Sequence, residues 1–161
     1  MARFFFYGTL LDADVQQLVF GHALADSAIR PAVLEHYRPA RARGKLYPIL
    51  AARRHARTAG VVVAGLGSLD VARLFFYEDT GYETQEVRVT VGGDRTKTAW
   101  VFIPSRRMVA LASNWSLAEW QRRHKPRVLP AIAAMMRAFP GEGRLPSFRA
   151  WRVRRRRPAG V

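Results

Sequence analysis

The segment over residues 74–91, LFFYEDTGYETQEVRVTV, contains the side chain with the clearest potential for chemistry, the carboxylate of Glu78. Three aromatic residues, Phe75, Phe76 and Tyr77, come directly before it. A carboxyl group that aromatic neighbours shield from water has a raised pKa and can exchange protons near neutral pH. The segment therefore predicts an acid/base residue at Glu78. The alternative is a solvated glutamate in a turn between a helix and a strand.

The spacing of apolar residues predicts the elements that hold Glu78. Apolar side chains over residues 69–77 suit one face of a helix, with Ser68 as its cap and Asp70 in its first turn. Glu78 then lies near the C-terminal end of that helix, where the helix dipole raises the pKa of a carboxylate further. Over residues 82–91, valines alternate with polar residues, which predicts a half-buried strand.

The N-terminal sequence RFFFYGTLL predicts a buried strand over residues 3–7 that ends in a turn at Gly8 and Thr9. A glycine at the end of a strand lets backbone N–H groups approach a ligand closely, because no Cβ is in the way. The alternative is an ordinary buried strand followed by an ordinary turn. A helix over residues 12–20 is expected next, capped by Asp12 or Asp14 and ended by Gly21.

Further elements follow from runs of apolar residues and from glycine and proline. Extended segments are predicted at residues 32–37, 42–50, 60–66 and 97–103, with a basic loop at 51–59 and a hairpin turn at 92–94. Pro48 marks an edge or an end of its strand. Residues 116–119 have the form of a capping box that opens a helix through Arg122 or His124. A break before a second helix at residues 130–139 and a short strand at 148–153 complete the prediction.

Composition restricts the kind of chemistry. The chain has no cysteine, which excludes disulfides, thiolate metal sites and a cysteine nucleophile. Its four histidines are scattered singly, and no nucleotide-binding or zinc motif occurs, so neither a metal nor a cofactor is expected. No apolar run approaches the roughly 18 residues of a membrane span. A cytoplasmic protein is therefore expected.

The chain is strongly basic, with 27 Lys and Arg against 12 Asp and Glu and a net charge of +15. The basic residues gather at residues 38–57 and in a tail at 149–157. Such a tail is either a solvated, flexible end or a segment that binds a polyanion weakly. We expect one domain over residues 1–148 and a basic tail over residues 149–161.

Two pieces of the sequence resemble the gamma-glutamylcyclotransferase-like family. Members begin with a strand that ends in YG[ST]L, which is matched by Tyr7, Gly8, Thr9 and Leu10. They later carry a pattern similar to LDxYEGxxYxRxxVxV, which is matched by Leu74, Tyr77, Glu78, Tyr82, Val87 and Val89. Further matches are LYPIL at residues 46–50, the VxG at residues 63–65 and AWVFIP at residues 99–104. Three positions depart from the pattern, namely Phe75, Asp79 and Thr84.

The resemblance implies an α+β fold, with one mixed domain built on a small twisted barrel-like sheet with packed helices. It also implies a cofactor-independent reaction in which the α-amino group of a gamma-glutamyl compound attacks its own γ-carbonyl and forms 5-oxoproline. Glu78 would then be the general acid/base. The backbone of Tyr7, Gly8, Thr9 and Leu10 would bind the substrate and its oxyanion, and Tyr82 would position the ligand through its hydroxyl.

Two other functions fit the same residues. A protein of this fold could bind a small carboxylate or amine without converting it, because three positions near Glu78 differ from the family pattern. A nucleic-acid-binding protein could use the arginine-rich tail together with the basic region over residues 38–57. Against the second function, the aromatic residues lie in apparent core strands and are not interleaved with the basic runs.

Overall fold

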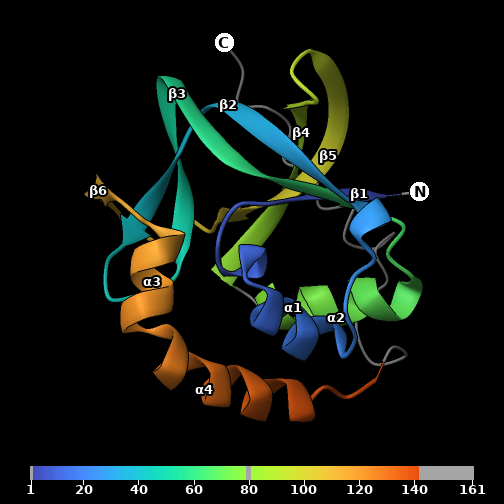
Figure 1. Cartoon of the computed structure of the whole chain (residues 1–161). Coiled ribbons are helices and arrows are strands. Elements are labelled where there is room, and N and C mark those ends of the chain that lie inside the picture. Colours follow the sequence, from blue (N-terminus) through green and yellow to red (C-terminus); the bar gives the residue numbers. More distant parts are fainter. Residues whose placement is uncertain (1, 79–80, 142–161) are drawn as a thin grey trace.

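The chain folds around a closed five-stranded barrel, seen in a computed structural model that describes residues 2–78 and 81–141 (Figure 1). The strand order is β3-β1-β5-β4-β2, and a pairing of β2 with β3 closes the barrel. A sixth strand, β6, pairs with β2 outside the ring. The strands are β1 (Arg3–Phe6), β2 (Ile29–Ala42), β3 (Pro48–Ala64), β4 (Tyr82–Val91), β5 (Arg95–Pro104) and β6 (Ala110–Asn114). This arrangement confirms the predicted mixed α+β fold with a barrel-like sheet.

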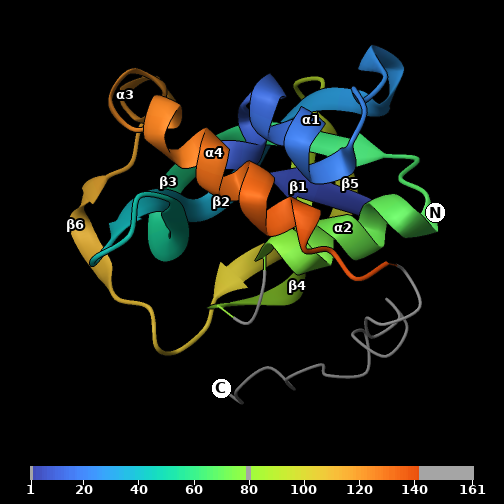
Figure 2. The same ribbon diagram turned by 90° about the horizontal axis from the view of Figure 1, so that it is seen from below.

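Helices cover one side of the barrel, as the view from below shows (Figure 2). In this view α4 runs in front of α1 and α2, and α3 leads into it from the side of β6. The helices are α1 (Ala13–Phe20), α2 (Ser68–Glu78), α3 (Leu117–Arg123) and α4 (Lys125–Arg137), with short 3-10 turns at η1 (Thr9–Leu11) and η2 (Asp26–Ala28). The C-terminal half of the chain thus returns to pack on elements formed by its first 80 residues.

Strand β1 is buried on both faces, which explains its continuous apolar sequence. Successive side chains of a strand point to opposite faces. Phe4 and Phe6 belong to the cluster that joins the barrel to the helices, whereas Phe5 and the following Tyr7 belong to a cluster whose other members are strand residues. The strand therefore connects the two parts of the core, and it fixes the start of the turn that follows it.

Several predicted boundaries are confirmed. Asp12 caps α1 by accepting hydrogen bonds from the N–H groups of Asp14 and Val15, and Gly21 ends the helix in the left-handed conformation. Pro48 begins β3, and β4 has the predicted bounds. Ser116 caps α3 by accepting from the N–H of Glu119. The expected strand at residues 148–153 and the tail lie outside the described residues.

The predicted loop at residues 51–59 is wrong, because these residues continue β3 and pair with β2. The register shifts near His36, and both His36 and His55 have positive φ angles. Most side chains of residues 51–58 are exposed, so the segment lacks the apolar alternation by which a strand is predicted. The extended segment predicted at residues 32–37 lies within the longer β2. The segment predicted at residues 42–50 is wrong at its centre, because β2 ends at Ala42, residues 43–47 form a connection and β3 begins at Pro48.

Two helix starts also differ from the prediction. Ser68 is the first residue of α2 and not its cap; the N–H of Gly67 donates to Asp70. The break between the last two helices falls at His124, and Pro130 lies inside α4. The hydrogen bond that Pro130 cannot donate would go to the carbonyl of Pro126, so α4 lacks one of its internal hydrogen bonds there.

Replacing Asp12 with Ala is expected to lower the free energy of unfolding by about 2–4 kcal/mol. This carboxylate is almost fully buried and also accepts hydrogen bonds from Gln121 and Lys125, each at 2.8 Å. Its burial favours a raised pKa, but these hydrogen bonds outweigh it and lower the pKa of Asp12. The substitution would remove the cap of α1 and leave Lys125 without its buried partner. Urea unfolding measures the loss.

Asp14 provides the matched control, because its exposed carboxylate also contacts Lys125, at 2.7 Å. Asp14→Ala should cost less than about 1 kcal/mol, as expected for an exposed ion pair. Equal losses in the two variants would contradict the assigned role of Asp12.

Candidate active site

A pocket of about 460 Å³ opens between one end of the barrel, the C-terminal end of α2 and the last two helices. All six residues predicted from the sequence as site residues line it: Tyr7, Gly8, Thr9, Leu10, Glu78 and Tyr82. The pocket thus brings the turn after β1 together with a carboxylate that lies about 70 residues later in the chain. The assignment of these residues to binding and catalysis stays a prediction.

Glu78 is the last residue of α2, and Leu74, one turn before it, is fully buried in the core. Among the described residues, the structure gives the Glu78 carboxylate no hydrogen bond and no ion pair. Burial raises the pKa of Glu78 to about 8. The group can therefore gain or lose a proton near neutral pH, as general acid/base chemistry requires.

Three tyrosines, Tyr7, Tyr77 and Tyr82, line the pocket with this carboxylate. The hydroxyl of each makes a hydrogen bond within the protein. Tyr7 donates to the carbonyl of Phe102 at 3.0 Å, and Tyr77 and Thr9 share a hydrogen bond of 2.8 Å. Burial, followed by the charge of Glu78, raises the pKa of Tyr7 and of Tyr77. These phenols stay protonated, so Glu78 is the group that titrates in this part of the pocket.

Tyr82 lines the pocket, but its hydroxyl donates to the carbonyl of Pro48 at 3.0 Å. The hydroxyl proton that was expected to position a ligand is therefore already used. What Tyr82 offers a ligand is the face of its ring and the lone pairs of its oxygen. Burial raises the pKa of Tyr82, so it too stays neutral.

The turn after β1 is shaped by Gly8. A Cβ at this position would lie 2.8 Å from Cγ of Pro48, closer than side chains tolerate. Thr9 begins η1 directly afterwards, and the first N–H groups of a helical turn have no partner within it. The N–H groups of Thr9 and Leu10 are therefore suited to hold an oxygen of a ligand.

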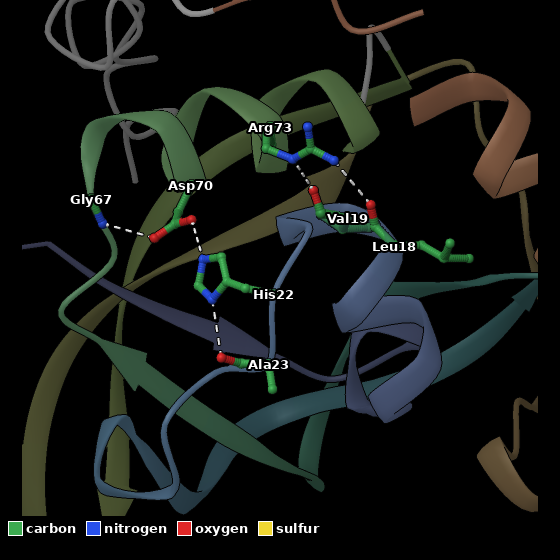
Figure 3. Close-up of polar contacts among 7 residues, drawn as sticks. All are labelled: Leu18, Val19, His22, Ala23, Gly67, Asp70 and Arg73. Carbon is green, nitrogen blue, oxygen red and sulfur yellow. Dashed lines mark hydrogen bonds and ion pairs between the residues drawn. The ribbon is translucent and has the colours of Figure 1, made fainter. Parts of the chain in front are cut away.

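Helix α2 is fixed to α1 at the end remote from Glu78 (Figure 3). Arg73 donates to the carbonyls of Val19 and Leu18, at 2.6 and 3.1 Å, in the last turn of α1. His22 lies with Nε2 2.8 Å from Asp70 and Nδ1 3.0 Å from the carbonyl of Ala23. The hydrogen bond to Asp70 raises the pKa of His22. These contacts fix the position of the helix that carries the carboxylate.

Replacing Tyr77 with Phe is expected to lower the free energy of unfolding by about 1–2 kcal/mol. The change removes the hydrogen bond that joins the end of α2 to the turn after β1 and leaves the buried hydroxyl of Thr9 without that partner. Chemical denaturation measures this loss in the free energy of unfolding. Tyr47→Phe removes a pocket hydroxyl that has no hydrogen bond to any described residue, and it should change stability by less than about 0.5 kcal/mol. An equal effect of both changes would show that the Tyr77–Thr9 contact is not what stabilises this junction.

Two of the positions that depart from the family pattern, Phe75 and Thr84, do not line the pocket. Phe75 packs against Phe4 and Phe102 with ring centroids 6.2 and 5.3 Å apart, and it does not line the pocket. Thr84 pairs with Phe102 within the β4–β5 ladder. The third position, Asp79, lies outside the described residues.

Part of the basic region over residues 38–57 stabilises the fold. Arg38 donates to the carbonyl of Ser113 and to Asn114 on β6. Arg41 pairs with Glu119 on α3. Arg57 pairs with Glu35 at 2.9 Å. These arginines are therefore less available to a polyanion than the sequence suggested.

The sequence did not indicate every residue that lines the pocket. Lys45, Tyr47 and Met108 come from the connections beside β3 and β5, and α3 and α4 supply further walls. The LYPIL motif at residues 46–50 was a usable signal for the first of these walls. Trp120 is buried in the core and also lines the pocket. Among the described helices, none combines the length and the apolar character needed to cross a membrane.

Comparison with known families gives one match that spans most of the barrel. The model of the family Gamma-glutamyl cyclotransferase, AIG2-like matches residues 4–122. This range includes the turn after β1, Glu78, Tyr82 and Trp120, and it ends before α4.

Similar proteins and structures agree with this match. AIG2-like protein A of Arabidopsis thaliana is 24% identical over 137 residues, covering 82% of this chain and 79% of that protein. Two Arabidopsis thaliana proteins solved in solution have TM-scores of 0.59 at 20% and 22% identity, each covering 84% of this chain and 81% and 91% of their own. A solved gamma-glutamyl cyclotransferase has a TM-score of 0.51 at 15% identity, covering 68% of this chain and 69% of its own. At these identities the structural likeness shows the fold.

Proposed function

The chain belongs to the Gamma-glutamyl cyclotransferase, AIG2-like family, and on that premise we propose that it is a cofactor-independent gamma-glutamylcyclotransferase with Glu78 as its general acid/base. The observation that supports this most directly is the position of Glu78. Its carboxylate has a raised pKa, lacks a partner among the described residues, and lines the same pocket as the turn after β1. A proton carrier and a set of backbone donors are thus available to one ligand.

The reaction joins two ends of the same substrate. The α-nitrogen of the glutamyl group forms a bond to the carbon of its γ-carbonyl group, and the bond between that carbon and the leaving nitrogen breaks. Two protons leave the α-ammonium group, one to expose its lone pair and one as the ring amide forms. Two protons reach the leaving nitrogen, which departs as an ammonium ion. No bond to the protein is formed, so the protein needs to bend the substrate and move protons.

Glu78 is suited to carry these protons in both directions. With a pKa of about 8, it can accept a proton from an adjacent ammonium group and return one to the leaving nitrogen. The N–H groups of Thr9 and Leu10 would stabilise the negative charge that develops on the oxygen of the γ-carbonyl group. Lys45 and Glu78 are the only formally charged side chains that line the described pocket, and they match the α-carboxylate and α-ammonium of a glutamyl group.

The test is the release of 5-oxoproline from purified protein mixed with a panel of gamma-glutamyl amino acids and amines. Each compound is paired with its N-acetylated form, in which the attacking nitrogen is blocked. We expect 5-oxoproline from at least one free compound and none from any acetylated form. Absence of product from the whole panel would contradict the proposal. Thermal stabilisation by the same compounds without product would instead favour a protein of this fold that only binds them.

A further inference from the structure

Helices α3 and α4 supply one wall of the pocket, and that wall is apolar. The lining residues from these helices are Trp120, Val128, Ala131, Ile132 and Met135, none of which is charged. Trp120 and Ile132 are buried, Val128 and Met135 are partly buried, and Ala131 is exposed at the edge of the pocket. A ligand group that lies against this wall gains free energy in proportion to the apolar surface it buries.

Four of these five residues come from α4, which lies beyond the part of the chain that the family model matches. The part matched by the family model supplies Glu78 and the turn after β1, and the segment that follows it supplies the wall formed by α4. An apolar wall of this kind can select among substrates that share the same reacting group.

Trp120 adds a specific polar requirement to this wall. Its side chain is 1% exposed, and its indole Nε1–H has no hydrogen-bond partner among the described residues. Buried donors are rarely left without an acceptor, because losing their contact with water is costly. A ligand oxygen that reaches this N–H from the pocket would satisfy it.

We propose that the wall formed by α3 and α4 binds the leaving group of the substrate, and that it selects an uncharged, apolar group carrying a carbonyl oxygen for Trp120. The proposal rests on the proposed function. The glutamyl end of the substrate carries an ammonium and a carboxylate, and it must place its nitrogen at Glu78. The wall without charges is therefore left for the group on the other side of the scissile amide. An apolar amino acid with its carboxyl group masked as an amide has this chemistry.

Four compounds separate the parts of this proposal: gamma-glutamyl-leucinamide, gamma-glutamyl-isopentylamide, gamma-glutamyl-leucine with a free carboxylate, and gamma-glutamyl-methylamide. The leaving group of the isopentylamide has the side chain of leucinamide but lacks its carbonyl. The leaving group of gamma-glutamyl-leucine carries a carboxylate, and that of the methylamide does not reach the wall. Calorimetry with Glu78→Gln, which is expected not to consume the ligands, gives their dissociation constants.

We expect the leucinamide to bind about 5- to 20-fold more tightly than the isopentylamide, because only the leucinamide can accept from Trp120. We expect the leucinamide to bind at least about 10-fold more tightly than gamma-glutamyl-leucine, whose carboxylate would be placed against an apolar wall. Trp120→Phe should abolish the first difference and leave the affinity for the methylamide unchanged. Equal binding of the leucinamide and the isopentylamide, or a difference that survives Trp120→Phe, would overturn the proposal.

A second pair of variants covers the outcome in which Trp120→Phe does not fold. Ala131→Glu places a carboxylate at the exposed edge of the wall and should weaken the leucinamide at least about 10-fold relative to the methylamide. Ala134→Glu, on the same helix but outside the pocket, is the control and should change neither affinity. Unaltered selectivity in Ala131→Glu would contradict the proposal.

Turnover of the methylamide by the parent protein reports on the proposed function separately. If the methylamide forms 5-oxoproline while the leucinamide has no advantage in binding, the cyclotransferase assignment stands and the leaving-group site is refuted. If the leucinamide binds more tightly as expected but none of the four compounds is converted, the binding site for this group is supported and the proposed reaction is refuted. Absence of binding by all four would overturn the inference outright.

Discussion

Replacing Glu78 with Gln is expected to lower kcat for 5-oxoproline formation by about 10²- to 10⁴-fold, the range typical of a lost general acid/base. The amide keeps the shape of the side chain and cannot accept or return a proton. In the parent protein, kcat/KM should rise with pH towards a midpoint near 8, where the carboxylate becomes ionised. The variant should lose this limb of the profile. Steady-state kinetics from pH 6 to pH 9 measures both effects.

Glu83 offers the control for this experiment, because its carboxylate is exposed on β4 only five residues from Glu78. Glu83→Gln should leave kcat within a factor of about 2, as expected for a surface change remote from the pocket. If Glu78→Gln releases 5-oxoproline as fast as the parent, the role assigned to Glu78 is wrong.

The same substitution is expected to stabilise the protein at pH 8, by up to about 5 kcal/mol relative to its effect at pH 4.5. Burial holds the pKa of Glu78 at about 8 in the folded protein, against an ordinary value of 4.5. Between these two pH values the unfolded chain releases the proton and the folded protein keeps it. The free energy of unfolding therefore falls as pH rises through this window, and the effect is complete above the folded pKa.

Urea unfolding of the parent and of Glu78→Gln at pH 5, 6.5 and 8 measures this difference. Other titrating groups, including His22 and Lys125, are present in both proteins and cancel in the comparison. The stability gained by the variant should grow with each step of pH. A gain that is the same at all three pH values would show that Glu78 has an ordinary pKa.

The six residues that the sequence singled out line one pocket, because the signals that indicate them are local. Three aromatic residues before Glu78 indicate a shielded carboxyl, and alternation over residues 82–91 indicates the strand that follows it. The aromatic run before Gly8 indicates a buried strand that ends in a turn. None of these patterns alone shows that the turn and the carboxyl meet. Their order and spacing, through the resemblance to a family, made that expectation possible.

The parts that were missed depend on contacts between distant residues. Residues 51–59 are extended because they pair with β2, although their basic side chains carry no strand pattern. Pro130 lies inside α4, although proline interrupts the hydrogen bonds of a helix and a break was therefore expected before it. The placement of α4 over the pocket depends on packing against α1 and on the ion pair between Lys125 and Asp12. No periodicity in the sequence reports such an arrangement.

Direct titration tests whether the partly buried carboxyl group of Glu78 exchanges protons near neutral pH. Carbon NMR of the protein labelled at its glutamate side-chain carboxyl groups follows each group as pH is varied, and Glu78→Gln identifies the signal of Glu78. We expect a midpoint for this signal near pH 8. A midpoint near the ordinary value of about 4.5 would contradict this expectation.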